Sequence, residues 1–185
     1  MKDLINSSIT KHSEALQLIE KSEIITSANM ILKGINNGNT IFWCGNGGSA
    51  SQANHLSAEL IGGMYQKKIK PFKSICLNVD TAFITAWSND DSFDNIFSRQ
   101  LEALSKPGDI LVGLSTSGNS LNILNSAIFA QSNQLKVISL TGNDGGKLKR
   151  NSHININIPI DSTQRIQEMH ILIGHILCDI IELSL

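Results

Sequence analysis

Apolar residues recur along the chain in two kinds of pattern, and the two kinds alternate. Short apolar runs, the last of which begins in strict alternation, predict strands over 40–44, 73–79, 110–114, 135–140 and 154–160. Apolar positions three and four residues apart predict helices over 52–64, 81–89, 93–105, 119–132 and 163–183. Alternation of strand and helix through most of the chain predicts an α/β fold with a parallel sheet wrapped by helices.

Residues 3–35 show helical spacing without a proline, as one bent helix or two helices in series. Their apolar stripe is wider than one sheet face usually covers, so a partner subunit could cover the remainder. The last helix, 163–183, raises the same question. Its core stripe is flanked by further apolar residues most of the way round: Ile171, Leu172, Cys178 and Ile181. A second copy of the chain is the simplest cover, so the pattern predicts a homo-oligomer.

Composition narrows the class of protein. The 185 residues fit one domain spanning 1–185, and a net charge of -1 gives no electrostatic reason to expect nucleic acid or an acidic membrane surface as partner. Three widely spaced cysteines indicate buried thiols in a reducing compartment. No signal-peptide segment and no membrane span is evident, so we expect a cytoplasmic protein.

The strongest candidate for chemistry follows the strand 110–114. Its apolar run stops at Ser115, Thr116 and Ser117, and a helix begins beyond Gly118. The N–H groups of a helix start, together with these hydroxyls and that of Ser120, could surround the oxygens of a phosphate. The alternative is that Ser117 or Asn119 only caps the helix.

A glycine-rich loop follows the strand 40–44. Three glycines in Gly45–Gly48 would let the backbone approach a ligand closely, with Ser49 or Ser51 as the helix cap. Both special loops follow strands, and parallel sheets bind ligands beyond the carboxyl ends of their strands. The two loops are therefore expected to serve one ligand.

His55 and Glu59 lie four residues apart on the helix after the glycine loop, so they share a face. An imidazole and a carboxylate at this spacing make half of a metal site, which Gln167 and His175 of the last helix could complete. A simple surface hydrogen bond between His55 and Glu59 is the alternative. Asn89 and Asp90 suit either a turn or a ligand, and three other histidines are assigned structural roles: His12, His153 and His170.

These motifs, taken together, resemble the phosphoheptose isomerases of the sugar isomerase (SIS) domain family. The resemblance runs nearly end to end and is carried by the segments Gly45-Asn-Gly-Gly-Ser-Ala, His55-Leu-Ser-Ala-Glu59, Asn89-Asp90, Ser115-Thr-Ser-Gly-Asn-Ser120 and Arg165-Ile-Gln-Glu-Met-His-Ile-Leu-Ile-Gly-His175. It implies a three-layer, flavodoxin-like sandwich with a five-stranded parallel sheet. It also implies a homotetramer with active sites between subunits. The N-terminal helices of residues 1–36 would pack within this oligomer.

The resemblance implies conversion of sedoheptulose 7-phosphate to glycero-manno-heptose 7-phosphate, on the way to lipopolysaccharide or other surface glycans. One divalent metal per subunit, usually zinc, would be held by His55, Glu59, Gln167 and His175. The substrate would contact the hydroxyl loop at Ser115, Thr116, Ser117 and Ser120, and elsewhere Asn46, Gly47, Gly48, Ser49, Ser51, Glu59, Asn89, Asp90 and Gln167. Because moving a carbonyl between neighbouring carbons requires proton transfer through an enediol, Glu59 is the candidate base and His175 the candidate acid.

One position departs from the family pattern. Relatives usually follow the Glu59 helix with Gly-Arg, whereas this chain has Gly62-Gly63, so a cation for the ligand is absent there or comes from Lys67, Lys68 or Arg165. Two other functions remain open, and the departure at Gly63 bears on the second. One is a non-catalytic phosphosugar-binding protein of the same family, such as the type that partners a replication initiator. The other is an isomerase or sensor of a different phosphosugar.

Overall fold

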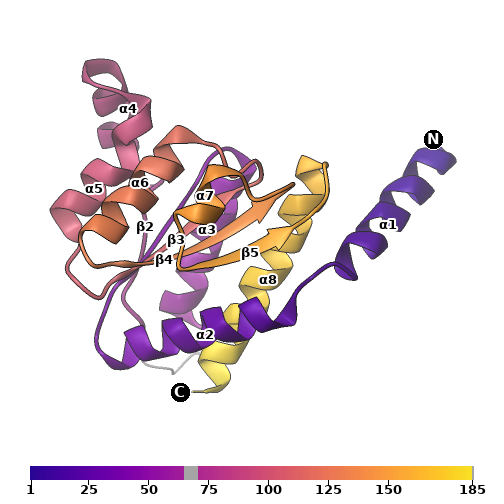
Figure 1. The fold of residues 1–185 in the computed structure, drawn as a ribbon, viewed down its shortest axis with the longest axis horizontal. Coiled ribbons are helices and arrows are strands. Elements are labelled where there is room, and N and C mark those ends of the chain that lie inside the picture. Colours follow the sequence, from indigo (N-terminus) through magenta and orange to yellow (C-terminus); the bar gives the residue numbers. More distant parts are fainter. Residues whose placement is uncertain (65–70, 185) are drawn as a thin grey trace.

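The computed structural model describes residues 1–64 and 71–184, and its centre is a five-stranded parallel sheet between layers of helices (Figure 1). The strands are β1 (Ile41–Gly45), β2 (Ser74–Cys76), β3 (Ile110–Ser115), β4 (Lys136–Gly142) and β5 (Ile154–Ile158). The helices are α1 (Lys2–Leu16), α2 (Lys21–Asn36), α3 (Gly48–Gly62), α4 (Thr81–Asp90), the 3₁₀ turn η1 (Phe93–Asn95), α5 (Ile96–Leu104), α6 (Leu121–Ser132), α7 (Gly146–Arg150) and α8 (Thr163–Leu183). The predicted fold class is confirmed.

The strands lie in the order β2-β1-β3-β4-β5, with every neighbouring pair parallel. The chain moves outward from β1 to β2 and then returns past β1 to β3, so the winding direction reverses between β1 and β3. Gly45 at the end of β1 lies opposite Leu114 near the end of β3. The glycine loop and the hydroxyl loop therefore leave the same edge of the sheet side by side.

Alternation along the strands divides the interior into two cores. On β1, Ile41 and Trp43 face the core shared with α2, α3 and α8, whereas Phe42 and Cys44 face the core shared with α5, α6 and α7. All four side chains are at most 1% exposed. A strand buried on both faces explains why 40–44 is a continuous apolar run rather than an alternating one.

Helix α8 packs unusually close to α3, and two glycines permit this approach. A Cβ atom on Gly174 of α8 would lie 2.4 and 2.5 Å from the two Cδ atoms of Leu56 on α3. At the other end of the contact, a Cβ atom on Gly48 would lie 2.7 Å from the side-chain amide nitrogen of Gln167. The glycine backbones thus lie directly against side chains of the other helix, which fixes how the two helices that carry the candidate site are placed.

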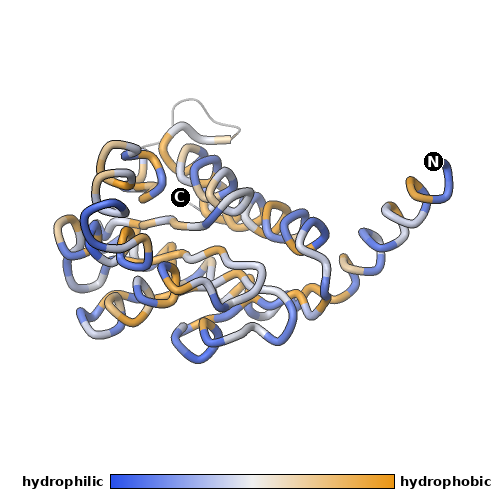
Figure 2. Tube along the Cα trace, turned by 90° about the horizontal axis from the view of Figure 1, so that it is seen from above, coloured by the Kyte–Doolittle hydropathy of each residue, from blue (hydrophilic) through white to orange (hydrophobic). Residues whose placement is uncertain are grey.

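The N-terminal segment forms two helices in series. Helix α2 packs on the body, whereas α1 projects away from it (Figures 1 and 2). His12 Nδ1 lies 2.7 Å from a carboxylate oxygen of Glu168, and Arg165 donates to the backbone carbonyl of Ser8 at 2.8 Å, so α1 is fastened to the start of α8. Within residues 1–64 and 71–184, no helix has the length and apolar content needed to cross a membrane.

Some element bounds differ from the sequence prediction. The strand expected over 73–79 spans only Ser74–Cys76, and β5 stops at Ile158 because Pro159 cannot donate to a strand ladder. Helix α7 was missed, since five residues are too short to show helical periodicity.

The apolar residues on all sides of α8 are covered largely by α1, α2 and α3 of the same chain. Burial of α8 therefore does not by itself require a second copy.

The Gly174 contact predicts an effect on stability. Gly174→Ala forces a methyl group against the fully buried Leu56, and we expect a net loss of about 1–2 kcal/mol in the free energy of unfolding, because overpacking outweighs the gain in helix propensity. The change is measured as a lower urea midpoint.

Gly62→Ala is the matched control, because Gly62 is also helical and a Cβ atom there meets nothing within 4 Å. We expect it to be neutral or slightly stabilising. Equal urea midpoints for the two variants would contradict the proposed limit on the approach of the helices.

Candidate active site

The glycine loop is shaped by backbone contacts rather than by a side-chain cap. Gly47 caps α3 with a φ of 55°, the helix begins at Gly48, and no side chain accepts a hydrogen bond from its first turn. The expectation that Ser49 or Ser51 caps this helix is therefore wrong, since both lie inside the helix. Asn78, beyond the end of β2, holds the loop from outside: its side chain accepts from Gly45 N at 3.1 Å and donates to Gly45 O at 2.8 Å.

The side-chain hydroxyls of the hydroxyl loop do not cap the helix that follows. The N-cap of α6 is Ser120, whose side chain makes no capping hydrogen bond. Ser115 Oγ instead donates to Ser120 Oγ at 3.2 Å across the loop, and Ser117 Oγ accepts from Asn119 N at 3.1 Å. Thus neither Ser117 nor Asn119 caps α6, so the capping alternative for these two residues is wrong.

Two asparagines join the two loops. Asn46 Nδ2 donates to Asn122 Oδ1 at 2.8 Å, and Asn122 Nδ2 donates back to Asn46 Oδ1 at 2.9 Å. Asn122 also accepts from Ile123 N at 2.9 Å, and its side chain is nearly buried. Asn46 was proposed to contact the sugar, but in this structure its amide is used to align the glycine loop with the first turn of α6.

The structure brings together His55, Glu59 and His175. His55 Nε2 lies 2.9 Å from His175 Nε2 and 3.4 Å from Glu59 Oε1, with the two imidazole rings edge to face. His55 and Glu59 come from α3 and His175 from α8, so the packing of these helices creates the cluster. The side chains of His55 and Glu59 are 47% and 22% exposed. The cluster is therefore within reach of a ligand.

Gln167 lies at the other end of the contact between α3 and α8. Its side-chain amide is beside Gly48, and its backbone carbonyl accepts from Gln52 Nε2 at 2.6 Å. Gln52 is a residue that the sequence analysis missed, and its position one turn before His55 was the available signal. Within the described part of the chain, no hydrogen bond joins the Gln167 side chain to His55, Glu59 or His175.

The donor set of this cluster suits zinc chemically, although the present geometry is not that of a bound ion. Across residues 1–64 and 71–184, no three His, Cys, Asp or Glu side chains are arranged to hold a metal ion as they stand. The separation of 2.9 Å between the His55 and His175 nitrogens is a hydrogen bond. Two imidazoles and a carboxylate are donor types that zinc accepts, so these side chains would hold the ion if they turned their donor atoms toward one point.

Other candidates are not brought to this cluster within one chain. Asn89 and Asp90 are the last two residues of α4, exposed, and bonded to each other at 2.8 Å. Arg165 pairs with Glu168 and bonds to α1, so it does not replace the missing cation. Gly63 has a φ of 77°, a conformation that disfavours any side chain at this position, and Lys67 and Lys68 fall outside the described residues.

The remaining histidines bond to structural groups. His170 Nε2 donates to the carbonyl of Thr141 at 3.1 Å in the interior, His153 Nδ1 accepts from Val137 N at 3.0 Å, and His12 contacts Glu168. The three cysteines are free and buried, and burial raises the pKa of the Cys178 thiol to about 12, assisted by the nearby charge of Glu59. Cys178 is therefore a thiol next to the cluster rather than a ligand.

Comparison with known proteins identifies the family. The model of the SIS domain matches residues 6–142. The chain belongs to the SIS domain family. A phosphoheptose isomerase of Helicobacter hepaticus is 46% identical over 184 residues, covering 98% of this chain and 93% of that protein. Structures of phosphoheptose isomerases from Neisseria gonorrhoeae and Francisella tularensis superpose with a TM-score of 0.90 each, at 37% and 36% identity.

The two structural matches cover 97% and 98% of this chain, and 97% and 95% of those chains. The resemblance seen in the sequence is thus confirmed: this SIS domain protein is similar to the phosphoheptose isomerases over 97–98% of its length.

The buried His170 predicts a pH dependence of stability. Burial lowers its pKa from 6.5 to about 4, so below pH 6.5 the unfolded chain binds a proton that the folded chain excludes. Unfolding free energy should therefore fall by about 3 kcal/mol between pH 6.5 and pH 4 through this residue. Urea titrations across that range measure the loss.

His170→Gln is the comparison variant, because glutamine retains an N–H donor for Thr141 and does not titrate. Its unfolding free energy should fall less steeply with acid than that of the wild type. Identical slopes for both proteins would exclude His170 as a source of the acid sensitivity.

Proposed function

We propose that this protein isomerises sedoheptulose 7-phosphate to D-glycero-D-manno-heptose 7-phosphate. The observation that carries the proposal is the meeting of His55, Glu59 and His175 in a chain whose full-length relatives are phosphoheptose isomerases. The reaction needs groups that accept, hold and return protons, and imidazole and carboxylate side chains supply them. The hydroxyl loop at the switch point supplies a place for the phosphate.

In the proposed reaction, Glu59 accepts the proton from carbon 1 of the ketose and returns it to carbon 2. His175 donates a proton to the carbonyl oxygen and accepts one from the neighbouring hydroxyl, so that the carbonyl moves by one carbon. Ser115, Thr116, Ser117 and Ser120 bind the phosphate, assisted by the backbone N–H groups of α6. Binding the distant phosphate orients the reacting carbons without taking part in the proton transfer.

We propose that one divalent metal ion per subunit, preferably zinc, is held by His55, Glu59, Gln167 and His175. The support is the donor chemistry of the cluster and the proximity of His55 to both His175 and Glu59. A bound cation would supply Lewis-acid stabilisation of the negative charge that develops on the two sugar oxygens. The proton transfers themselves remain with the protein side chains.

We propose a homotetramer, with α1 and α2 in the subunit contacts. Three apolar side chains on α1 are exposed to solvent: Leu4 by 71%, Ile9 by 61% and Ile5 by 54%. A neighbouring chain would bury them and could bring Asn89 and Asp90 to a shared site.

The product would enter the synthesis of nucleotide-activated heptose for lipopolysaccharide or other surface glycans, in the cytoplasm. A non-catalytic phosphosugar-binding role is less favoured, because such a protein has no need of an assembled His-Glu-His cluster. Action on another phosphosugar is the second alternative, and it is motivated by Gly63 in place of arginine.

The proposed function is tested by incubating the purified protein with sedoheptulose 7-phosphate and measuring aldoheptose phosphate. We expect turnover by the wild type and a loss of about 10²–10⁴-fold in Glu59→Gln, because the amide cannot accept the proton. Glu102→Gln, an exposed change on α5, is the control and should retain turnover. Wild-type-like activity in Glu59→Gln would remove Glu59 from the mechanism, and no product from the wild type would refute the function.

The metal proposal predicts that chelation lowers activity and that added Zn²⁺ restores it. The loss should require less chelator at low pH, since only neutral imidazole binds a metal ion. Metal content of the protein is measured alongside activity, and His55→Ala should contain less metal than the wild type. Full activity after exhaustive chelation would show that the cation is dispensable.

A further inference from the structure

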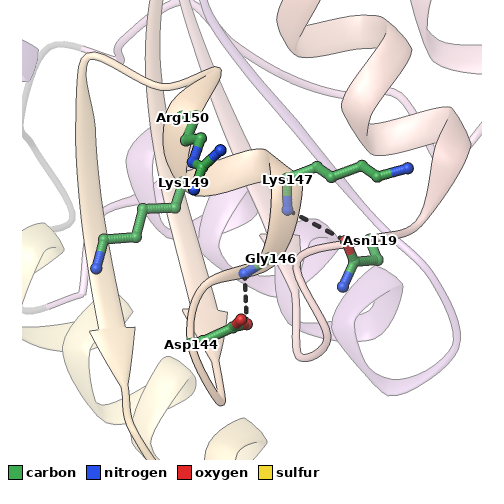
Figure 3. Close-up of a pocket in the computed structure, with 6 residues that line it drawn as sticks. All are labelled: Asn119, Asp144, Gly146, Lys147, Lys149 and Arg150. Carbon is green, nitrogen blue, oxygen red and sulfur yellow. Dashed lines mark hydrogen bonds between the residues drawn. The ribbon is translucent and has the colours of Figure 1, made fainter.

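A polar cavity lies on α7, beside the hydroxyl loop but outside the His55 cluster. It has a volume of about 570 Å³, which is within the range of small-molecule sites (Figure 3). Its lining consists of Asn119, Asp144, Gly146, Lys147, Lys149 and Arg150. Nothing in the proposed isomerase reaction uses these side chains.

The charges lining this α7 cavity are unbalanced. Lys147, Lys149 and Arg150 lie within four consecutive positions, all exposed, and none of the ion pairs between described residues includes them. The one carboxylate of the lining, Asp144, accepts the backbone N–H of Gly146 at 3.0 Å. Three cations against one carboxylate leave a local excess of positive charge, which favours a ligand with at least two negative charges.

A neighbouring cavity provides an internal comparison. It has a volume of about 640 Å³ and shares Asn119 and Asp144 with the α7 cavity, but its other charged residue is Asp161 and it contains no cation. The lining of the α7 cavity therefore has an excess of cations, whereas that of its neighbour has carboxylates only. The chain distinguishes the two openings by charge, not by size.

The cations can contact different parts of one ligand. In Figure 3 the side chain of Lys147 extends over Asn119, whereas that of Lys149 extends to the opposite side and Arg150 lies between the two directions. The two lysine side chains point away from each other in this view, so both must turn toward the cavity to contact one anion, and all three cationic side chains are exposed and free of neighbours that would prevent this. Arginine binds phosphate oxygens in a bidentate manner and lysine as a point charge, so the set suits a pyrophosphate group.

The α7 cavity is separate from the hydroxyl loop, but hydrogen bonds and backbone contacts connect the two segments. Leu148 N donates to Gly118 O at 2.9 Å, and Lys147 N donates to Asn119 Oδ1 at 3.1 Å. A Cβ atom on Gly118 would lie 2.0 Å from Gly145 O, so the two segments are in backbone contact. Asn119 Nδ2 also donates to Ser117 O at 2.9 Å and so links the lining of the cavity to the loop.

We propose that the α7 cavity is a second anion-binding site for a small molecule that carries a pyrophosphate group. Its occupant lowers the affinity of the hydroxyl loop for a sugar phosphate, because two anions on adjoining segments repel each other. By linkage, a sugar phosphate in the loop weakens the occupant of the α7 cavity by the same factor.

The test uses inorganic pyrophosphate as the probe and isothermal titration calorimetry at low salt. We expect the wild type to bind two pyrophosphates per chain, one in the hydroxyl loop and one in the α7 cavity. The triple variant Lys147→Gln, Lys149→Gln, Arg150→Gln should bind one, with at least tenfold weaker affinity for the other. Ser115→Ala combined with Ser120→Ala should retain the α7 site.

The matched control removes three exposed lysines elsewhere, by Lys21→Gln, Lys106→Gln and Lys136→Gln, so that the net charge changes equally. It should bind two pyrophosphates. Thermal melts confirm that all variants fold, and the readout does not depend on isomerase activity. Two sites remaining in the α7 variant, or equal loss in the control, would refute the proposal.

A further outcome separates the α7 site from an extension of the sugar phosphate site. Saturating sedoheptulose 7-phosphate should displace one pyrophosphate and weaken the second without displacing it. Displacement of both would show that the α7 cations belong to the substrate site and would overturn the proposal.

Discussion

The approach of α8 to α3 is limited by backbone atoms, because Gly174 has no side chain to separate it from Leu56. A helix pair held by long side chains can slide or rotate, whereas one that touches through a glycine has a single position of closest contact. That position places His175, the next residue after Gly174, against His55, the residue before Leu56. The cluster is therefore a direct consequence of the contact, since both histidines adjoin the residues that define it.

The sheet provides the second constraint. The β1–β3 pairing sets the exits of the glycine and hydroxyl loops next to each other, and asparagines complete their alignment. Asn78 holds Gly45 from the side of β2, and Asn122 holds Asn46 from the side of α6. Each asparagine amide both donates and accepts, so it can satisfy an irregular stretch of backbone or another amide that has no ladder partner.

The sequence was sufficient to predict the fold class and most helices and strands, because the apolar runs and the helical spacing of apolar residues extend over whole segments. It also paired His55 with Glu59, since four residues on a helix fix their common face. It could not establish that His175 contacts His55, which depends on packing at Gly174, nor could it find Asn78, whose role comes from tertiary hydrogen bonds. The expected helix caps at Ser49 or Ser51 were wrong because Gly47, a glycine with positive φ, caps α3 and so places both serines inside the helix.

The reciprocal pair of Asn46 and Asn122 links positions 76 residues apart in the chain. Each amide is the partner that the other lacks, so replacing either one alone leaves a buried or half-buried polar group without its complement. Substitutions at these two positions should therefore appear in related sequences as correlated changes, with both asparagines kept or both exchanged for another complementary pair.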